Sequence, residues 1–101
     1  MEKEYFVYIL ANHRNGTLYI GITNDLQRRI SEHRSSGVDS FTGRHHLYRL
    51  VYYEITNSIT TALNREKRLK KWKRDWKIDL IENTNPSWCD LLSGSPGQAG
   101  G

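Results

Sequence analysis

The 101-residue chain has little cysteine and proline and no long apolar run. Its single cysteine, Cys89, cannot form an internal disulfide, and no segment approaches the roughly 20 apolar residues that a membrane-spanning helix requires. The first residues also lack the charged and apolar regions of a secretory leader. These absences predict a cytoplasmic protein without a membrane segment. One domain is expected over residues 1–92, because residues 93–101 contain almost no apolar side chains and should form a disordered tail, of the kind that cloning leaves.

Motifs of several common enzymes and metal sites are absent as well. The sequence contains no glycine-rich nucleotide-binding loop, no paired spacing of zinc ligands and no arrangement typical of a serine or cysteine triad. Cys89 and the pair His45-His46 have no partners at ligand spacing. A zinc centre is therefore not expected.

Positive charge, in contrast, is concentrated in one stretch. Residues 65–77 hold eight of the fifteen lysines and arginines and two acids, so this segment carries a net charge of +6 whereas the whole chain carries +4. Trp72 and Trp76 lie within it. A one-sided basic segment with interleaved aromatic residues suits a polyphosphate such as nucleic acid. The alternative is an ordinary solvated helix face, which is a common cause of charge runs.

Three segments have the β-branched and aromatic composition of strands: 5–10, 18–22 and 47–55. Between the first two, Asn15-Gly16 predicts a two-residue type I′ turn, which pairs positions whose numbers sum to 31. In that register the first and second strands point Tyr8 and Tyr19 to the same face, but not directly opposite each other. An active pair of tyrosines would then depend on the irregular ends of the hairpin.

A helix should follow the second strand with almost no connecting loop. Asn24 is placed to cap its N-terminus, with Gln27 completing a capping box, and the helix should end near Arg34. Leu26 and Ile30 recur at helical spacing and form the inward stripe.

The two adjacent arginines of this helix should have different surroundings. At about 100° per residue, Arg29 and His33 lie beside the packed stripe, where the preceding strand delivers Tyr19 and Gly21. Gly21 indicates a point where another group approaches the backbone of that strand. Arg28 should point to solvent on the opposite side.

A second, longer helix should begin after Asn57 or Ser58 and run to about Arg74. Residues 75–83 are expected to form a short further helix or a kinked continuation. Asn85-Pro86 should end it, because a residue that precedes proline avoids the helical region.

Glu66 is an acid on the face of the second helix that should pack inward. The helical projection places it among Ile59, Ala62, Leu63 and Leu69, where a carboxylate is costly unless it is paired or binds a cation. The alternative to a functional role is an ion pair with Lys70, four residues later. Arg65, Arg68 and Lys71 project away from this stripe.

Phosphodiester hydrolysis needs an attacking water, a proton acceptor, positive charge on the phosphoryl oxygens and help for the leaving oxygen. A hard divalent cation on one carboxylate supplies the last two and keeps most of its coordination sphere for water and phosphate. Glu66, Arg29, His33 and the tyrosines provide groups for the remaining tasks.

Several segments together resemble the GIY-YIG endonuclease superfamily. The matching pieces are V-Y-I-L at 7–10, L-Y-I-G at 18–21, T-N-D-L-Q-R-R-I-S-E-H at 23–33, L-V-Y-Y-E at 50–54, A-L-N-R-E-K-R-L-K at 62–70 and N-P-S-W-C-D-L at 85–91. They are most similar to the small stand-alone bacterial branch of the superfamily. Phe6-Val7 stands where the family has Gly-Ile before its first tyrosine.

The resemblance implies an α/β fold of the α+β type, with a three-stranded antiparallel sheet flanked by helices. It also implies an endonuclease that depends on Mg²⁺ or another divalent cation. Because the sequence encodes one Glu66 and one Arg29, the enzyme is expected to nick one strand per encounter. Matched position by position, the family's catalytic residues fall on Tyr8, Tyr19, Arg29, His33 and Glu66, with Glu66 as the metal ligand. A free tyrosine has a pKa of about 10, and which tyrosine orients or deprotonates the water is left open. Asn83 and Asn85 are not securely matched to an asparagine that many members place near the site.

DNA is the expected partner, with RNA as the alternative, and the protein is expected to be a monomer or a weak homodimer. The residues expected to contact nucleic acid are Gly21, Arg44, Arg65, Arg68, Lys70 and Lys71. The rival hypothesis is a non-catalytic nucleic-acid-binding module that uses a basic helix over residues 65–77. A protein-interaction scaffold with a degenerate site is a third.

Overall fold

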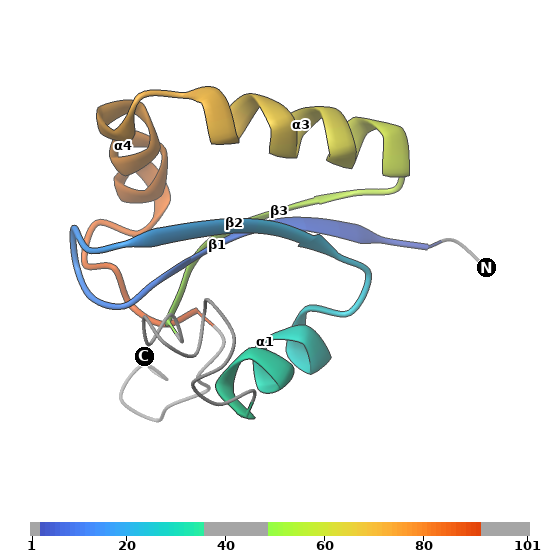
Figure 1. Cartoon of the computed structure of the whole chain (residues 1–101), viewed down its shortest axis with the longest axis horizontal. Helices are drawn as coiled ribbons and strands as arrows, with labels where there is room; N and C mark the ends of the chain where they lie inside the picture. The colour runs from blue at the N-terminus through green and yellow to red at the C-terminus, as the bar shows by residue number, and fades with distance from the viewer. Residues whose placement is uncertain (1–2, 36–48, 92–101) are drawn as a thin grey trace.

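The computed structural model describes residues 3–35 and 49–91, with side chains for residues 3–32 and 49–91. Its elements are β1 (Tyr5–Ala11), β2 (Leu18–Thr23), α1 (Leu26–Ser35), β3 (Arg49–Thr56), α3 (Ile59–Lys71) and α4 (Arg74–Thr84). The strands form one antiparallel sheet in the order β2-β1-β3, with α1 on one face and α3 and α4 on the other (Figure 1). The predicted α+β class and three-stranded sheet flanked by helices are confirmed. The predicted tail at 93–101 lies outside the described residues, and within them no helix is long and apolar enough to cross a membrane.

The central strand β1 is buried on both faces of the sheet, which is why its sequence does not alternate between apolar and polar residues. Val7 and Ile9 belong to the core beneath α3 and α4, whereas Tyr8 and Leu10 belong to the core beneath α1. The helices contribute to these two cores the buried side chains of Ala62, Leu69, Ile81, Leu26 and Ile30.

The β1–β2 hairpin has a longer loop than predicted. Its register pairs Tyr8 with Gly21, so the paired numbers sum to 29, and the predicted two-residue turn is wrong. Asn15 does adopt the left-handed conformation, with φ of 59°, but inside a turn closed by the Gly16 amide donating to the His13 carbonyl at 2.9 Å. Because the shift is two residues, every side chain keeps its predicted face.

The first helix begins one residue later than predicted. Asp25 is its N-cap, since the Asp25 Oδ1 accepts a hydrogen bond from the Arg28 amide at 3.1 Å. Thr23 Oγ1 accepts from the Asp25 amide at 3.1 Å and holds the cap in place. Asn24 is thus not the cap, and the predicted capping box with Gln27 is wrong.

The basic segment 65–77 is divided between two helices, α3 and α4, with a bend at Trp72 and Lys73. α3 starts after the predicted cap Ser58, whose Oγ accepts from the backbone amide of Thr61 at 3.2 Å. It ends before Trp72 and Lys73, which have extended backbones with ψ of 150° and 151°, and α4 then turns across its end (Figure 1). The second helix therefore ends three residues earlier than predicted, and the further helix predicted over residues 75–83 is present as α4.

Candidate active site

The candidate site is centred on Tyr8 of β1, whose phenol lies against the edge strand β2 at Gly21. Tyr8 lies directly opposite Gly21 and is 1% exposed. A Cβ atom added to Gly21 would lie 2.6 Å from the Tyr8 Oη and 2.7 Å from its Cζ. No other residue type leaves room for this ring, so Gly21 is the predicted point of close approach, and the approaching group is the phenol of Tyr8.

Tyr19 lies next to Tyr8 on the same face of the sheet. It pairs with Leu10, two positions further along β1, and the Tyr8 and Tyr19 ring centroids are 6.3 Å apart with the planes at 43°. The regular strand pairing therefore brings the two tyrosines together, and the predicted need for irregular hairpin ends is wrong.

The first turn of α1 adds a guanidinium to this pair. Arg29 forms a hydrogen bond with Tyr8, and its Nη1 donates to Glu32 Oε1 at 3.2 Å. Its side chain is 43% exposed, so part of the group remains open to a ligand. Arg28 is 61% exposed, and its Nε lies 3.9 Å from Glu32 Oε2. The predicted difference in position between Arg28 and Arg29 is confirmed.

Burial raises the pKa of Tyr8 above its ordinary value of 10.0, and the hydrogen bond and charge of Arg29 oppose this only in part. The neighbouring Tyr19 and Glu66 raise it further. The hydrogen bond with Tyr8 in turn raises the pKa of Arg29. In the free protein near neutral pH, Tyr8 is therefore a neutral phenol beside a cation.

Glu66 belongs to α3, which lies on the opposite face of the sheet from α1 (Figure 1). Its charge is the smallest of the influences that act on the pKa of Tyr8. α3 contacts β2, the edge strand that carries Gly21. The Glu66 side chain is 19% exposed, and its Oε2 lies 2.9 Å from Lys70 Nζ. The ion pair predicted as the alternative is thus present, in the position where a functional carboxylate was predicted.

The donor set suits a cation that needs few protein ligands. Among the residues that the structure describes, no group of three His, Cys, Asp or Glu side chains could hold a metal ion. Mg²⁺ is commonly bound by one or two carboxylates, with waters and substrate phosphates completing its shell. Glu66 alone at a partly open edge fits that mode of binding, with Lys70 as its present partner.

Arg65 does not project outward as predicted. Its Nε and Nη2 donate to both carboxylate oxygens of Glu54 on β3 at 2.8–3.1 Å, and the guanidinium lies 5.2 Å from the centroid of the Trp72 ring. Ile59 and Leu63, predicted to face inward, are instead 43% and 45% exposed. The helix is rotated so that Arg65 rather than these apolar residues faces the sheet.

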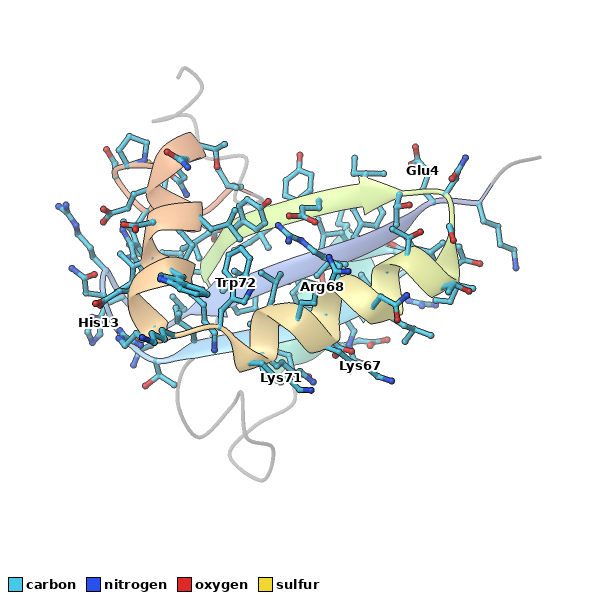
Figure 2. All side chains as sticks on the ribbon, turned by 90° about the horizontal axis from the view of Figure 1, so that it is seen from above. Glu4, His13, Lys67, Arg68, Lys71 and Trp72 are labelled. Atoms are coloured by element: carbon cyan, nitrogen blue, oxygen red, sulfur yellow. The ribbon has the colours of Figure 1, made fainter. Side chains whose placement is uncertain are left out.

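The remaining predicted residues lie on the outer surface of α3 or beyond the described part. Arg68, Lys70 and Lys71 are exposed. In Figure 2, Lys67 and Lys71 lie on one side of α3, whereas Arg68 and Trp72 lie on the other. The backbone of His33 belongs to α1, but its side chain, like all of Arg44, lies outside the described residues.

The cluster of Tyr52, Glu54 and Arg65 was missed at the sequence level. Tyr52 Oη donates a short hydrogen bond to Glu54, which also accepts from Arg65. Burial alone would raise the pKa of Glu54, but the hydrogen bonds from Arg65 and Tyr52 and the charge of Arg65 lower it overall. An acid within the apolar strand segment L-V-Y-Y-E was the available signal. The cluster anchors α3 to β3 one residue before Glu66.

Asn85, one of the two unassigned asparagines, has a structural role. It is buried, its Nδ2 donates to the carbonyls of Val51 and Cys89 at 3.0 and 2.9 Å, and its Oδ1 accepts from the Cys89 amide at 3.0 Å. These bonds fasten the segment after α4 to β3 and do not point into the candidate site.

Three kinds of comparison with known proteins find similarities to this chain. The family model described as the GIY-YIG catalytic domain matches residues 4–79. A UPF0213 protein of Bacillus pumilus is 34% identical over 82 residues, which are 81% of this chain and 84% of the relative. A UPF0213 protein of Syntrophus aciditrophicus is 37% identical over 87 residues, or 85% and 97% of the two chains. The solution NMR structure of the UPF0213 protein BH0048 from Bacillus halodurans is similar with a TM-score of 0.55 and 28% identity, covering 91% of this chain and 97% of that chain.

Proposed function

Because the chain belongs to the GIY-YIG catalytic domain family, we propose that it is a metal-dependent endonuclease that hydrolyses phosphodiester bonds in DNA. The observation that carries the proposal is the hydrogen bond between Arg29 and Tyr8, where the Tyr8 phenol lies against Gly21 of the edge strand and is influenced by the charge of Glu66. This arrangement offers a neutral donor, a cation and a carboxylate to one phosphate group at an open edge.

Arg29 is proposed to bind the non-bridging oxygens of the scissile phosphate. Its planar guanidinium can form two parallel hydrogen bonds with a phosphate, and such charge-assisted bonds stabilise the charge that develops in the transition state. The exposed part of its side chain provides the necessary access.

The two tyrosines are proposed to divide the work. Tyr8 is buried and has a raised pKa, so it suits donating a hydrogen bond that orients the attacking water or the phosphate. Tyr19 is less buried and lies beside it, and together with His33 it is a candidate for accepting the proton of the water.

Glu66 is proposed to hold Mg²⁺ or another divalent cation, which supplies positive charge to the leaving oxygen. In that state Lys70 would release Glu66 and turn to a neighbouring phosphate, which its 55% exposed side chain allows. Lys70 then serves as the counter-charge of Glu66 when no metal is bound.

The test is cleavage of supercoiled plasmid by the purified protein with Mg²⁺, with EDTA, and with the variant Glu66→Gln. Glu4→Gln is the matched control, because Glu4 is exposed at the N-terminal end of β1, where Figure 2 labels it. We expect cleavage by the wild type and by Glu4→Gln in Mg²⁺, and none by Glu66→Gln or in EDTA. If Glu66→Gln unfolds at a much lower temperature and keeps its activity per folded molecule, Glu66 is a structural partner of Lys70 and the metal assignment fails.

The rival function is binding of nucleic acid without cleavage, which the net charge of +6 over residues 65–77 favours. The same experiment separates the two, when a binding assay is added. A protein that binds DNA at low salt and cleaves none in any divalent cation would be a binding module.

A further inference from the structure

A hollow on α3 lies apart from the candidate active site. It is lined by Thr61, Asn64, Arg65 and Arg68 and has a volume of about 260 Å³, against the ~30 Å³ that one water occupies in the liquid. These residues are three or four positions apart, so they form one continuous stripe along the helix. The hollow is therefore a regular feature of the helix surface with room for an anion and its waters.

The side chains that line the hollow are two arginines and two neutral residues with hydrogen-bond donors. Arg65 donates hydrogen bonds from Nε and Nη2 to Glu54, and this ion pair holds the Arg65 side chain in place at the hollow. Arg68 has no carboxylate partner in the part of the chain that the structure describes, and its side chain is exposed. Thr61 contributes a hydroxyl, and Asn64 contributes an amide. One uncompensated guanidinium with two neutral hydrogen-bonding groups is a donor set for a phosphate oxygen.

The hollow faces away from Glu66. At 100° per residue, Arg68 lies about 160° around α3 from Glu66. Figure 2 shows Arg68 and Trp72 on the side of α3 opposite to Lys67 and Lys71. A phosphate in the hollow is thus a different phosphate from the one at the edge of β2.

The surroundings of the hollow favour a polyanion over a single ion. Arg65 of the hollow lies over the ring of Trp72, at the bend between the helices. There the Trp72 and Trp76 ring centroids are 5.9 Å apart, and Lys73 Nζ lies 5.9 Å from the centroid of the Trp76 ring. Trp76 is 53% exposed. A free phosphate needs one compact cradle, whereas a basic surface that continues over two helices complements a chain of phosphates.

We infer that this hollow is a second phosphate-binding subsite for the backbone of the nucleic-acid substrate, with Arg68 and Asn64 as its principal ligands. The inference rests on the nucleic-acid substrate of the proposed function, and it adds that the substrate passes over α3 as well as along the edge of β2. The backbone contact positions the substrate and reads no bases.

The first experiment measures binding of a labelled DNA duplex in EDTA over a series of salt concentrations. Arg68→Ala should lower the slope of log affinity against log salt by about one unit, because one phosphate contact is lost. Arg28→Ala is the matched control, since Arg28 is an exposed arginine of α1 on the other face of the sheet, and its slope should stay that of the wild type. Equal slopes for the two variants would overturn the inference.

A second pair of variants adds one negative charge without changing side-chain size. Asn64→Asp should weaken binding about fivefold, the effect of one unit charge near a phosphate in water, whereas Gln27→Glu on α1 should have little effect. Both residues are exposed, so both variants are expected to fold. Equal weakening by the two substitutions would show that the hollow is not a phosphate site.

The source of the phosphate is tested by following the side-chain amide resonance of Asn64 in NMR spectra. A short duplex should shift it, whereas inorganic phosphate and a mononucleotide at equal ionic strength should not. An equal response to inorganic phosphate would overturn the assignment to a nucleic-acid backbone.

Cleavage of the duplex by the wild type in Mg²⁺, measured in the same series, separates this inference from the proposed function. Equal slopes with intact cleavage would remove the subsite and leave the nuclease. A slope that depends on Arg68 without any cleavage would keep the subsite and remove the nuclease. No binding at all would remove both.

Discussion

Arg28 and Arg29 are adjacent in the sequence, and their guanidinium groups have different surroundings. Arg29 contacts the Tyr8 phenol and is partly covered, whereas Arg28 extends into solvent near Glu32. The same two residues therefore offer a test in which charge, element and side-chain type are held constant.

We expect Arg29→Ala to reduce single-turnover cleavage by about 10²-fold or more, the usual cost of removing one preorganised donor from a transition state. Arg29→Lys should restore little of this, because a point charge does not replace a bidentate guanidinium. Arg28→Ala should retain most of the activity. The measurement is cleavage by the three variants at saturating protein, and a comparable loss at Arg28 would show that the phosphate lies elsewhere.

The helical projection succeeded for one arginine and failed for another. On α1, Leu26 and Ile30 are both buried, so the stripe they define placed Arg29 correctly. On α3, Ile59 and Leu63 were counted as part of the buried stripe, but both are exposed, so the predicted buried face was rotated from the observed one. Arg65 faces the sheet because its guanidinium pairs with Glu54 of β3, which also bonds with Tyr52. Arg65 and Glu54 are eleven positions apart and belong to different elements, so the periodicity of one helix cannot predict their ion pair.

At the scale of elements, the contact between α3 and β3 depends on Tyr52, Glu54 and Arg65. Burial, together with the hydrogen bond and charge of Glu54, raises the pKa of Tyr52 from 10.0 to about 12. The folded state therefore keeps this proton in a pH range where the unfolded chain loses it. The contribution of the protonated Tyr52 to the free energy of unfolding is therefore fully present below pH 10 and is lost as the pH rises towards 12.

Tyr52→Phe should be less stable than the wild type at neutral pH, because one hydrogen bond to a carboxylate is lost. The difference in free energy of unfolding should shrink by up to about 1.4 kcal/mol per pH unit between roughly pH 10 and 12. Urea unfolding of both proteins at several alkaline pH values measures it. A difference that stays constant over this range would mean that Tyr52 does not titrate as described.

The two asparagines near the end of α4 should differ in the same clear way. Asn85→Ala leaves buried partners on Val51 and Cys89 without hydrogen bonds, so we expect a loss of about 2–3 kcal/mol in the free energy of unfolding. Asn83→Ala is the matched control, since Asn83 is exposed in the last turn of α4, and its free energy of unfolding should stay within about 0.5 kcal/mol of the wild type. Cleavage per folded molecule should be unchanged in both, and a specific loss of cleavage in Asn85→Ala would assign it to the site after all.

Element types were predictable from the sequence, and their exact junctions were not. The β-rich segments and the order of strands and helices follow from composition and periodicity. The hairpin loop is longer than the two-residue turn that Asn15-Gly16 predicted. Two hydrogen bonds hold the longer loop: Asn12 Oδ1 accepts from the Thr17 amide at 3.0 Å, and Arg74 donates to the Gly16 carbonyl at 2.6 Å. The second of these bonds joins residues 58 positions apart, which no local pattern can show.

At the scale of the whole molecule, the site depends on the order of strands. β2 lies at the edge of the sheet, so groups from the α1 face and from the α3 face can meet around it. Tyr8 comes from the central strand, Arg29 from α1 and Glu66 from α3, and the lack of a side chain at Gly21 leaves room for the Tyr8 phenol beside β2. One chain therefore supplies one set of these groups.

A single site of this kind should cut one strand of a duplex per encounter, because the two strands run in opposite directions and only one can present its phosphate in the required orientation. Supercoiled plasmid should then convert to open circles before linear molecules appear, with an initial rate proportional to protein concentration. Gel analysis of a time course at limiting protein measures both, and Arg28→Ala should follow the same course as the wild type. Linear product that appears first, or a rate that rises with the square of the protein concentration, would show that two copies act together on the two strands.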